Sequence, residues 1–216
     1  MMKKEVGSEG FAIWLLGDSN PKQWENALEV PFDPRHPIRH NIWTSVLEVI
    51  QDKMFRECRQ RVDMSNLYIR NAIENAGHKP VGNSPLWREE IEQEIKRFGK
   101  QTREYHPPLL LCFGAFAFEF ARRALDEEPK RNHRYWDTEK LGQEFRQRIE
   151  RFEINAINAL PLLHRSIAGG KFIESHNYFC GQEGANYFET VGNRIADILI
   201  RHRDKLQIWI GETRTR

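Results

Sequence analysis

Short apolar runs alternate with longer amphipathic stretches along this chain. Four of the runs predict buried strands, because continuous apolar stretches bounded by turn residues are typical of strands that are covered on both faces. They are "FAIWLL" (Phe11 to Leu16), "LYIRN" (Leu67 to Asn71), "PPLLLCFG" (Pro107 to Gly114) and "NAINALPLLH" (Asn155 to His164). The stretch "LQIWIG" near the C-terminus is a candidate for a further edge strand.

The stretches between the predicted strands have the period of a helix. Trp43, Val46, Ile50 and Met54 recur three or four positions apart, which indicates one apolar helix face. Similar faces occur at Leu86 to Glu104, over "AFAFEFARRAL", at Thr138 to about Arg151, and from Tyr187 to Leu199. The charged segment "DEEPKRNHRYWD" between the third and fourth of these helices predicts a solvated surface excursion.

Strands that alternate with helices predict right-handed crossovers and a parallel sheet. We therefore expect an α/β fold, with three α/β/α layers around a central four-stranded, mostly parallel sheet. A chain of 216 residues fits a single domain that spans residues 1–216.

Composition and charge narrow the function classes. The chain is 39% hydrophobic and 30% charged, which is typical of a folded globular protein and excludes general disorder. The net charge of +2 provides no global attraction to nucleic acid, so DNA binding would need a local basic patch. The apolar run near the N-terminus is too short for a signal peptide or a spanning helix. We expect a cytoplasmic protein with no membrane partner.

Cysteines and histidines give no sign of a metal or a cofactor. Cys58, Cys112 and Cys180 are far apart in the sequence, which makes a disulfide framework or an iron-sulfur cluster improbable. His36 and His40 have the spacing of two ligands on one helix face, but Pro37 lies between them and disfavours that helix. The sequence therefore predicts no metal site and no cofactor.

Polar residues stand directly after the predicted strands. Asp18 to Pro21 follow the first strand, Asn71 ends the second, and His164 with Ser166 follow the fourth. In open parallel sheets, ligands bind beyond the carboxyl ends of the strands. The sequence therefore predicts a binding site at that edge.

The motifs at these strand ends resemble a known family. "LLGDSNP", "PFDPRHPIRHNIWTSVLEVI", "LYIRNA", "LLLCFGAFAFEFARRAL" and "LPLLHRS" occur in the order seen in the uracil-DNA glycosylase superfamily. The resemblance covers the chain from about Phe11 to Leu199 and suggests a divergent member. It implies a monomeric, monofunctional, cofactor-free DNA glycosylase that hydrolyses the N-glycosidic bond of a deaminated or modified base, uracil foremost. The implied partner is single- or double-stranded DNA that contains such a base.

The resemblance also implies roles for individual residues. In the catalytic positions, Asn20 would orient the attacking water, and His164 would donate a hydrogen bond to the base oxygen that gains charge as the bond breaks. In the base pocket, Phe32 would stack on the flipped base and Asn71 would pair with its Watson–Crick edge. Ser19 and Pro21 would border the base, whereas Arg165, Ser166 and Lys171 would contact the DNA backbone.

Each of these residues also has a purely structural interpretation. His164 is also typical of a hydrogen-bonded core histidine, Asn71 of a residue that ties down a loop, and Phe32 of a loop anchor in the core. Asp18 and Arg165 differ from the family's two catalytic motifs. These differences favour an alternative, in which a protein of the same fold only binds single-stranded nucleic acid, a nucleobase or a nucleoside.

Overall fold

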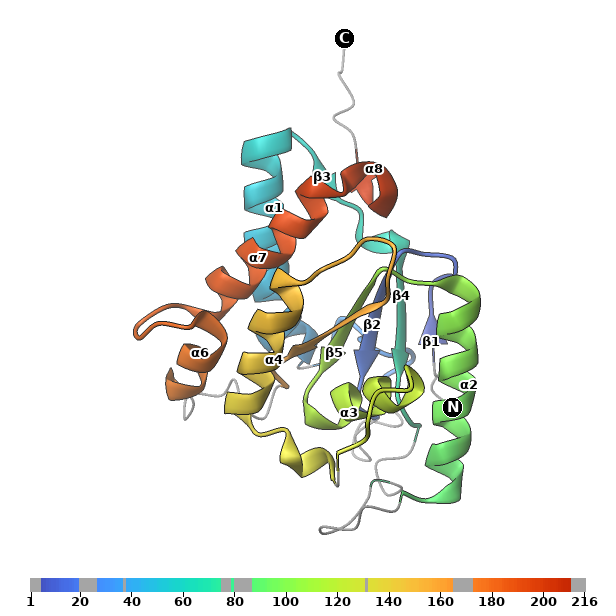
Figure 1. The fold of residues 1–216 in the computed structure, drawn as a ribbon. Helices are drawn as coiled ribbons and strands as arrows, with labels where there is room; N and C mark the ends of the chain where they lie inside the picture. Colours follow the sequence, from blue (N-terminus) through green and yellow to red (C-terminus); the bar gives the residue numbers. More distant parts are fainter. Residues whose placement is uncertain are drawn as a thin grey trace.

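The fold of this chain is α/β, built on a mixed, mostly parallel sheet of five strands (Figure 1). The computed structural model describes residues 5–19, 27–36, 38–74, 79, 87–130, 132–164 and 173–210. Among these residues, no helix combines the length and the apolar character that crossing a membrane requires.

Four parallel strands form the centre of the sheet, and they coincide with the four apolar runs. They are β2 (Ile13–Gly17), β4 (Leu67–Asn71), β5 (Leu109–Phe113) and β6 (Asn158–Leu162). Every residue of β2 and β5 is buried, because these two strands lie between neighbours and under helices.

A fifth strand corrects the expectation of a four-stranded sheet. The strand β1 (Glu5–Val6) pairs antiparallel with β4, so that the order is β1-β4-β2-β5-β6. With only two residues, β1 is too short to show any periodicity in the sequence. The predicted strand near the C-terminus exists as β7 (Trp209–Ile210), but it pairs with β3 (Arg61–Val62) in a separate two-stranded sheet.

Five helices lie where the apolar periodicity predicts them: α1 (Thr44–Cys58), α2 (Glu89–Tyr105), α3 (Ala115–Ala124), α4 (Thr138–Glu150) and α7 (Tyr187–Arg201). Two further helices, α6 (Ile173–Cys180) and α8 (Arg203–Leu206), were not predicted. Short π and 3₁₀ turns occur at η2 (Arg39–Trp43), η3 (Met64–Asn66) and η5 (His133–Tyr135). Side-chain caps fix two of the helix starts: Asp137 accepts from the Lys140 amide, and Asn186 from the amides of Phe188 and Glu189.

Different helices pack on the two faces of the sheet. Ile13, Leu109 and Leu111 share a small apolar space with Ile50 of α1 and Ile195 of α7. On the other face, Trp14 packs against Phe98 of α2 at a ring distance of 5.8 Å, and Phe98 contacts Phe120 of α3 at 5.6 Å. The sheet is therefore covered by α1 and α7 on one side and by α2 and α3 on the other (Figure 1).

The charged segment that follows α3 is exposed in part, as its composition predicts, but two of its described residues are buried. Asn132 and Trp136 in this segment are 5% and 4% exposed. The carboxylate of Glu119, which is fully buried, accepts hydrogen bonds from the Lys130 amide and from Trp136 Nε1. A buried carboxylate needs such donors. The segment therefore folds onto α3 because it supplies them.

Candidate functional site at the carboxyl edge of the sheet

The carboxyl ends of the parallel strands bring the predicted site residues to one edge of the sheet. Gly17 ends β2, Asn71 ends β4, Gly114 follows β5, and His164 lies two residues beyond β6. Since β2 and β5 lie between β4 and β6, the ends of the two outer strands flank the ends of the two central ones.

Asn71 lies over the end of the neighbouring strand. Its side chain is buried at 7% exposure, and a Cβ atom on Gly17 would fall 2.2 Å from Asn71 Oδ1. Beyond the strand ends, the Ala72 amide donates to the Gly17 carbonyl at 2.9 Å, and the Ile73 amide to that of Asp18 at 3.3 Å. Glycine at position 17 therefore gives the Asn71 amide the space to lean toward the centre of the sheet.

His164 approaches the turn that leads from β5 into α3. Gly114 begins that helix with φ +90°, and a Cβ atom there would fall 2.9 Å from the His164 Cβ atom. The preceding amide, that of Leu163, donates to the buried Tyr187 hydroxyl at 3.0 Å, which holds the end of β6 in place. The imidazole of His164 is partly buried, next to the centre of the edge.

Phe32 packs onto the end of β5. Its ring is 5% exposed and lies 4.7 Å from the ring of Phe113, between centroids. The backbone of Phe32 adopts φ +58°, a left-handed conformation that is an outlier for a bulky residue and often marks a functional constraint. The Arg39 side chain donates to the Phe32 carbonyl at 3.1 Å and helps to hold this conformation.

A buried carboxylate holds the loop around Phe32. Asp33 is 4% exposed, and it accepts hydrogen bonds from Arg35 Nε at 2.9 Å, Arg35 Nη2 at 2.8 Å and the Glu29 amide at 3.3 Å. The side-chain hydrogen bonds from Arg35 keep the pKa of Asp33 well below its usual range, although burial acts in the opposite direction. Asp33 is therefore ionised at neutral pH, and the loop geometry depends on that charge.

A second group of polar side chains lies at this edge, beside the end of β2. Lys79 Nζ donates to Asp18 Oδ2 at 2.7 Å and lies 5.7 Å from the centre of the Phe116 ring. His133 meets the same ring edge-on at 5.4 Å, and Trp87 stacks on it at 5.1 Å. We call these five residues the Phe116 cluster.

Three polar atoms of the Phe116 cluster are buried without a hydrogen-bond partner: Asp18 Oδ1, Trp87 Nε1 and His133 Nδ1. Within the described part of the chain, only two other buried side-chain atoms share this condition, Trp43 Nε1 and Gln60 Oε1. Burial also lowers the pKa of His133 below its ordinary value of 6.5, although the charge of Asp18 opposes that shift. His133 is therefore a neutral imidazole at neutral pH.

Sequence reasoning did not single out Lys79, Trp87, Phe116 or His133 as site residues. Lys79 and Trp87 come from the loop and the helix start that follow β4, and His133 from the charged segment after α3. No spacing in the sequence links these positions to Asp18. The signal that was available is Asp18 itself, an acid directly after a buried strand.

Several predicted site residues lie outside the described residues: Asn20, Pro21, Arg165, Ser166 and Lys171. Ser19 is described and is partly exposed at the start of the segment that follows β2. Of the predicted set, Phe32, Asn71 and His164 are therefore the residues that the described structure brings to the carboxyl edge.

The described residues contain no group of three or more His, Cys, Asp or Glu side chains that could hold a metal ion. Cys58, Cys112 and Cys180 are free thiols, and Cys112 is buried within β5, where burial raises the pKa of its thiol.

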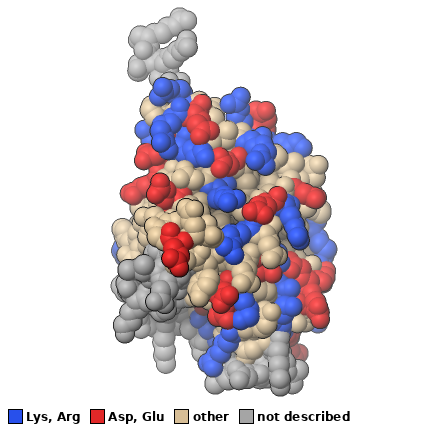
Figure 2. Space-filling view, turned by 60° about the vertical axis from the view of Figure 1, so that its left-hand side comes forward, with Lys and Arg blue, Asp and Glu red and all other residues tan. Residues whose placement is uncertain are grey.

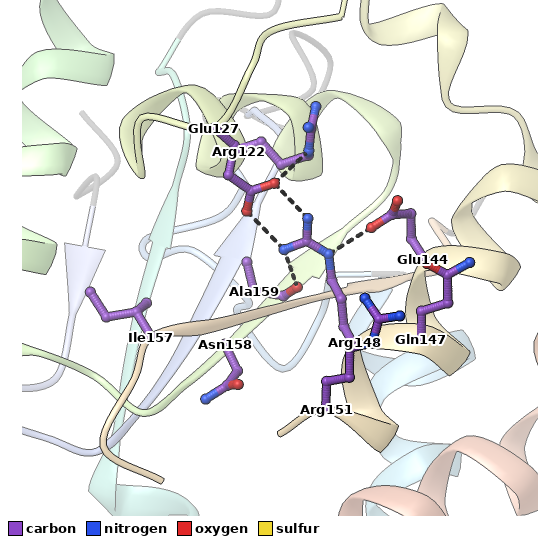
Figure 3. A pocket seen from close by; sticks show the side chains of 9 residues that line it. All are labelled: Arg122, Glu127, Glu144, Gln147, Arg148, Arg151, Ile157, Asn158 and Ala159. Carbon is purple, nitrogen blue, oxygen red and sulfur yellow. Dashed lines mark hydrogen bonds and ion pairs between the residues drawn. The ribbon is translucent and has the colours of Figure 1, made fainter. Parts of the chain in front are cut away.

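A cavity of about 390 Å³ lies at the opposite end of the sheet, beside the start of β6 (Figure 3). Charged side chains that bind one another line it. Arg148 donates to Glu144 at 2.7 Å, to Glu127 at 2.6 and 2.9 Å, and to the Ala159 carbonyl at 3.4 Å. Because the guanidinium of Arg148 already donates to these partners, it has few donors left for a ligand in the cavity.

Charge on the surface is mixed. On the face drawn in Figure 2, Lys and Arg side chains are interspersed with Asp and Glu. That face therefore lacks the single-sign field that would attract nucleic acid from a distance.

Comparisons with known proteins give this chain no family. No family model matches it, and no curated protein is similar enough to count as a relative.

Proposed function

We propose that this protein is a divergent member of the uracil-DNA glycosylase superfamily, which hydrolyses the N-glycosidic bond of a deaminated or modified base, uracil foremost. The observation that carries the proposal is the position of Phe32, Asn71 and His164 at the carboxyl edge of the sheet, each beside a strand end. The expected three-layer α/β/α arrangement around four parallel strands is part of the proposal.

The spacing of the strand ends supports a ring-shaped ligand. β4 and β6 stand three strand spacings apart in the order β4-β2-β5-β6, which is about 14 Å at the usual interstrand distance. Asn71 lies over Gly17, and His164 lies against Gly114, so both side chains are close to the central strands. Two polar side chains that approach from opposite sides suit hydrogen bonds to the two edges of one base.

The chemistry of the proposed reaction assigns a role to each side chain. Asn71 would pair with donor and acceptor groups of the base through its amide. His164 would donate to the base oxygen that becomes negative as the bond breaks, which is worth about 3 to 4 kcal/mol of activation free energy for a well-placed donor. Asn20 would orient the water that attacks the sugar.

The main alternative is a protein of the same fold that binds a base or single-stranded nucleic acid without cleaving it. The burial of Phe32 does not distinguish the two candidates, because a ring with 5% exposure offers a base little surface for stacking in either case. The Asp18–Lys79 ion pair favours the alternative, since it lies directly after β2, where the family has its first catalytic motif.

Base release from single-stranded oligonucleotides tests the proposal. Wild-type protein is expected to release uracil, or else hypoxanthine, xanthine or hydroxymethyluracil. His164→Ala should lower the rate on the order of 10²-fold, the effect of losing one donor to developing charge. His202→Ala, at the C-terminus of α7, is the matched control and should release the base at the wild-type rate.

The two candidates differ in the outcome of a binding measurement made on the same oligonucleotides. Binding without release by wild-type protein would select the non-catalytic alternative. The absence of both binding and release, across the four modified bases, would contradict both.

A further inference from the structure

The segment between α3 and α4 is anchored to the core but keeps one aromatic ring outside. Trp136 donates to the buried Glu119 at 2.7 Å, and the Lys130 amide donates to the same carboxylate at 2.8 Å. Between these two anchors, Tyr135 is 44% exposed, and its ring meets the Trp136 ring edge-on at 5.0 Å. The ring of Tyr135 is therefore an exposed aromatic surface on a backbone that buried hydrogen bonds hold in place.

Two ammonium groups lie beside this ring. Lys130 Nζ is 5.5 Å and Lys140 Nζ 5.0 Å from its centre. Lys140 also bonds Asp137. The Lys130 ammonium and the exposed Arg134 guanidinium have no carboxylate partner among the described residues. An exposed ring with cations around it is the combination that binds single-stranded nucleic acid, because a base stacks on the ring and the cations neutralise phosphates.

The ring lies on the side of the molecule that carries the proposed base site. Tyr135 and His133 belong to the same short helix, η5, and the His133 ring contacts Phe116 at 5.4 Å. Phe116 stands in the first turn of α3, two residues after Gly114, where a Cβ atom would fall 2.9 Å from the His164 Cβ atom. One turn of α3 and one turn of η5 therefore separate the carboxyl edge from Tyr135. A strand that has one base at this edge would bring a base a few nucleotides away to the ring.

We propose that Tyr135 is a stacking platform for an unpaired base of single-stranded DNA, and that Lys130 and Lys140 bind the adjoining phosphates. The inference rests on the proposed function for the choice of DNA as the polymer, and it adds a contact outside the base pocket. Because Asp137 already binds Lys140, Lys130 is expected to contribute more of the charge. The platform favours single-stranded over duplex DNA, since a paired base offers no free face for stacking.

Binding of an unmodified oligonucleotide tests the inference. The probe is a fluorescent single-stranded DNA of about 15 nucleotides, without uracil or any other modified base, and fluorescence anisotropy measures its Kd. Wild-type protein is expected to bind it more tightly than the corresponding duplex. Tyr135→Leu, which keeps an apolar side chain but removes the ring, should raise the Kd about tenfold. Tyr135→Phe should bind like wild type, because stacking needs the ring and not the hydroxyl.

Tyr105 provides the matched control. It is 40% exposed, close to the value for Tyr135, but it ends α2 shortly before β5 begins, at the amino ends of the strands. Tyr105→Leu should therefore leave the Kd unchanged. The same Kd for wild type and Tyr135→Leu, or an equal loss in Tyr105→Leu, would overturn the assignment of Tyr135. The absence of single-strand binding by wild-type protein would overturn it as well.

The salt dependence of binding tests the phosphate contacts separately from the ring. For a single strand, each lost phosphate contact lowers the slope of log Kd against log salt concentration by about 0.7. Lys130→Gln should show this loss, whereas Lys100→Gln, at an exposed position of α2, should keep the wild-type slope. An unchanged slope in Lys130→Gln would remove this lysine from the contact.

The binding results are separate from the test of catalysis, because the oligonucleotide contains no base to be removed. Binding that depends on Tyr135, without release of any modified base, would support the platform and contradict the proposed glycosylase. Base release by wild-type protein, together with unweakened binding by Tyr135→Leu, would support the glycosylase and contradict the platform.

Discussion

The two ends of the sheet differ in whether their buried polar groups have hydrogen-bond partners. Around the cavity near the start of β6, Glu127 binds both Arg122 and Arg148, and Arg148 also binds Glu144. At the carboxyl edge, the Phe116 cluster leaves three buried polar atoms without partners. Each unsatisfied atom costs about 1 to 3 kcal/mol. The paired groups at the first end stabilise the fold. The unpaired atoms at the carboxyl edge lower its stability, as is typical of functional sites, where a ligand can supply the missing partners.

The largest effect is expected from removing the charge of Glu119, which shares Arg122 with the network around Glu127. Glu119 is fully buried and accepts hydrogen bonds from Arg122, Arg123, Lys130 and Trp136. Glu119→Gln removes the charge that these donors surround, and should lower the free energy of unfolding by about 3 to 5 kcal/mol. Denaturant unfolding measures it, with the exposed Glu139→Gln as the control. A loss below 1 kcal/mol would contradict the view that this network holds the fold.

The carboxyl edge should respond in function rather than in stability. In Gly17→Ala, the new methyl group would meet Asn71 Oδ1, the end of a side chain that can rotate away. We expect base release to fall on the order of 10²-fold, with the unfolding free energy changed by less than about 1 kcal/mol. Gly10→Ala, where a Cβ atom meets nothing closer than 3.6 Å, is the control. If Gly17→Ala released the base at the wild-type rate, the position of Asn71 would not matter for the reaction.

Two tryptophans allow a direct comparison of a satisfied and an unsatisfied indole. Trp136 Nε1 donates to Glu119 at 2.7 Å, whereas Trp87 Nε1 has no partner. Both rings are nearly buried, so replacement by Phe removes similar apolar area. Trp136→Phe should therefore destabilise the protein by about 1 to 2 kcal/mol more than Trp87→Phe does. Equal losses of stability would mean that the Trp87 indole is satisfied in solution.

The smallest effect is expected in the pH dependence of stability. The folded-state pKa of His133 lies below 6.5, mainly because of burial, so below that pH the unfolded chain binds more protons than the folded one. The unfolding free energy should therefore fall as the pH is lowered from 7 through 6. In His133→Phe this fall should be shallower. An unchanged slope would show that His133 does not titrate differently on unfolding.

The sequence predicted the scaffold better than the site. Continuous apolar runs identified β2, β4, β5 and β6 because strands buried on both faces need them, whereas the two residues of β1 carry no pattern. The segment around Trp136 was predicted to be solvated surface, but its Lys130 amide and its Trp136 indole donate to Glu119, whose burial only the fold reveals.

The position of a residue at the carboxyl edge was predictable only where that residue directly follows a strand. This rule placed Asn71 and His164 at the edge, since parallel strands end on the same side of a sheet. Lys79 reaches this edge from the segment after β4, and His133 from η5, which follows α3. Their meeting with Asp18 depends on the packing of α2 and α3, which no local pattern encodes.

The bond from Arg148 to the Ala159 carbonyl has a consequence for self-association. β6 is the last strand on its side of the sheet, and an exposed outer strand is a template to which another polypeptide can add. The Arg148 guanidinium, which also binds Glu127 and Glu144, donates a hydrogen bond to the Ala159 carbonyl of this strand. That carbonyl is therefore not available to an added strand. Removing the guanidinium would expose that carbonyl to other copies of the chain, so that aggregation should rise with protein concentration as well as with unfolding.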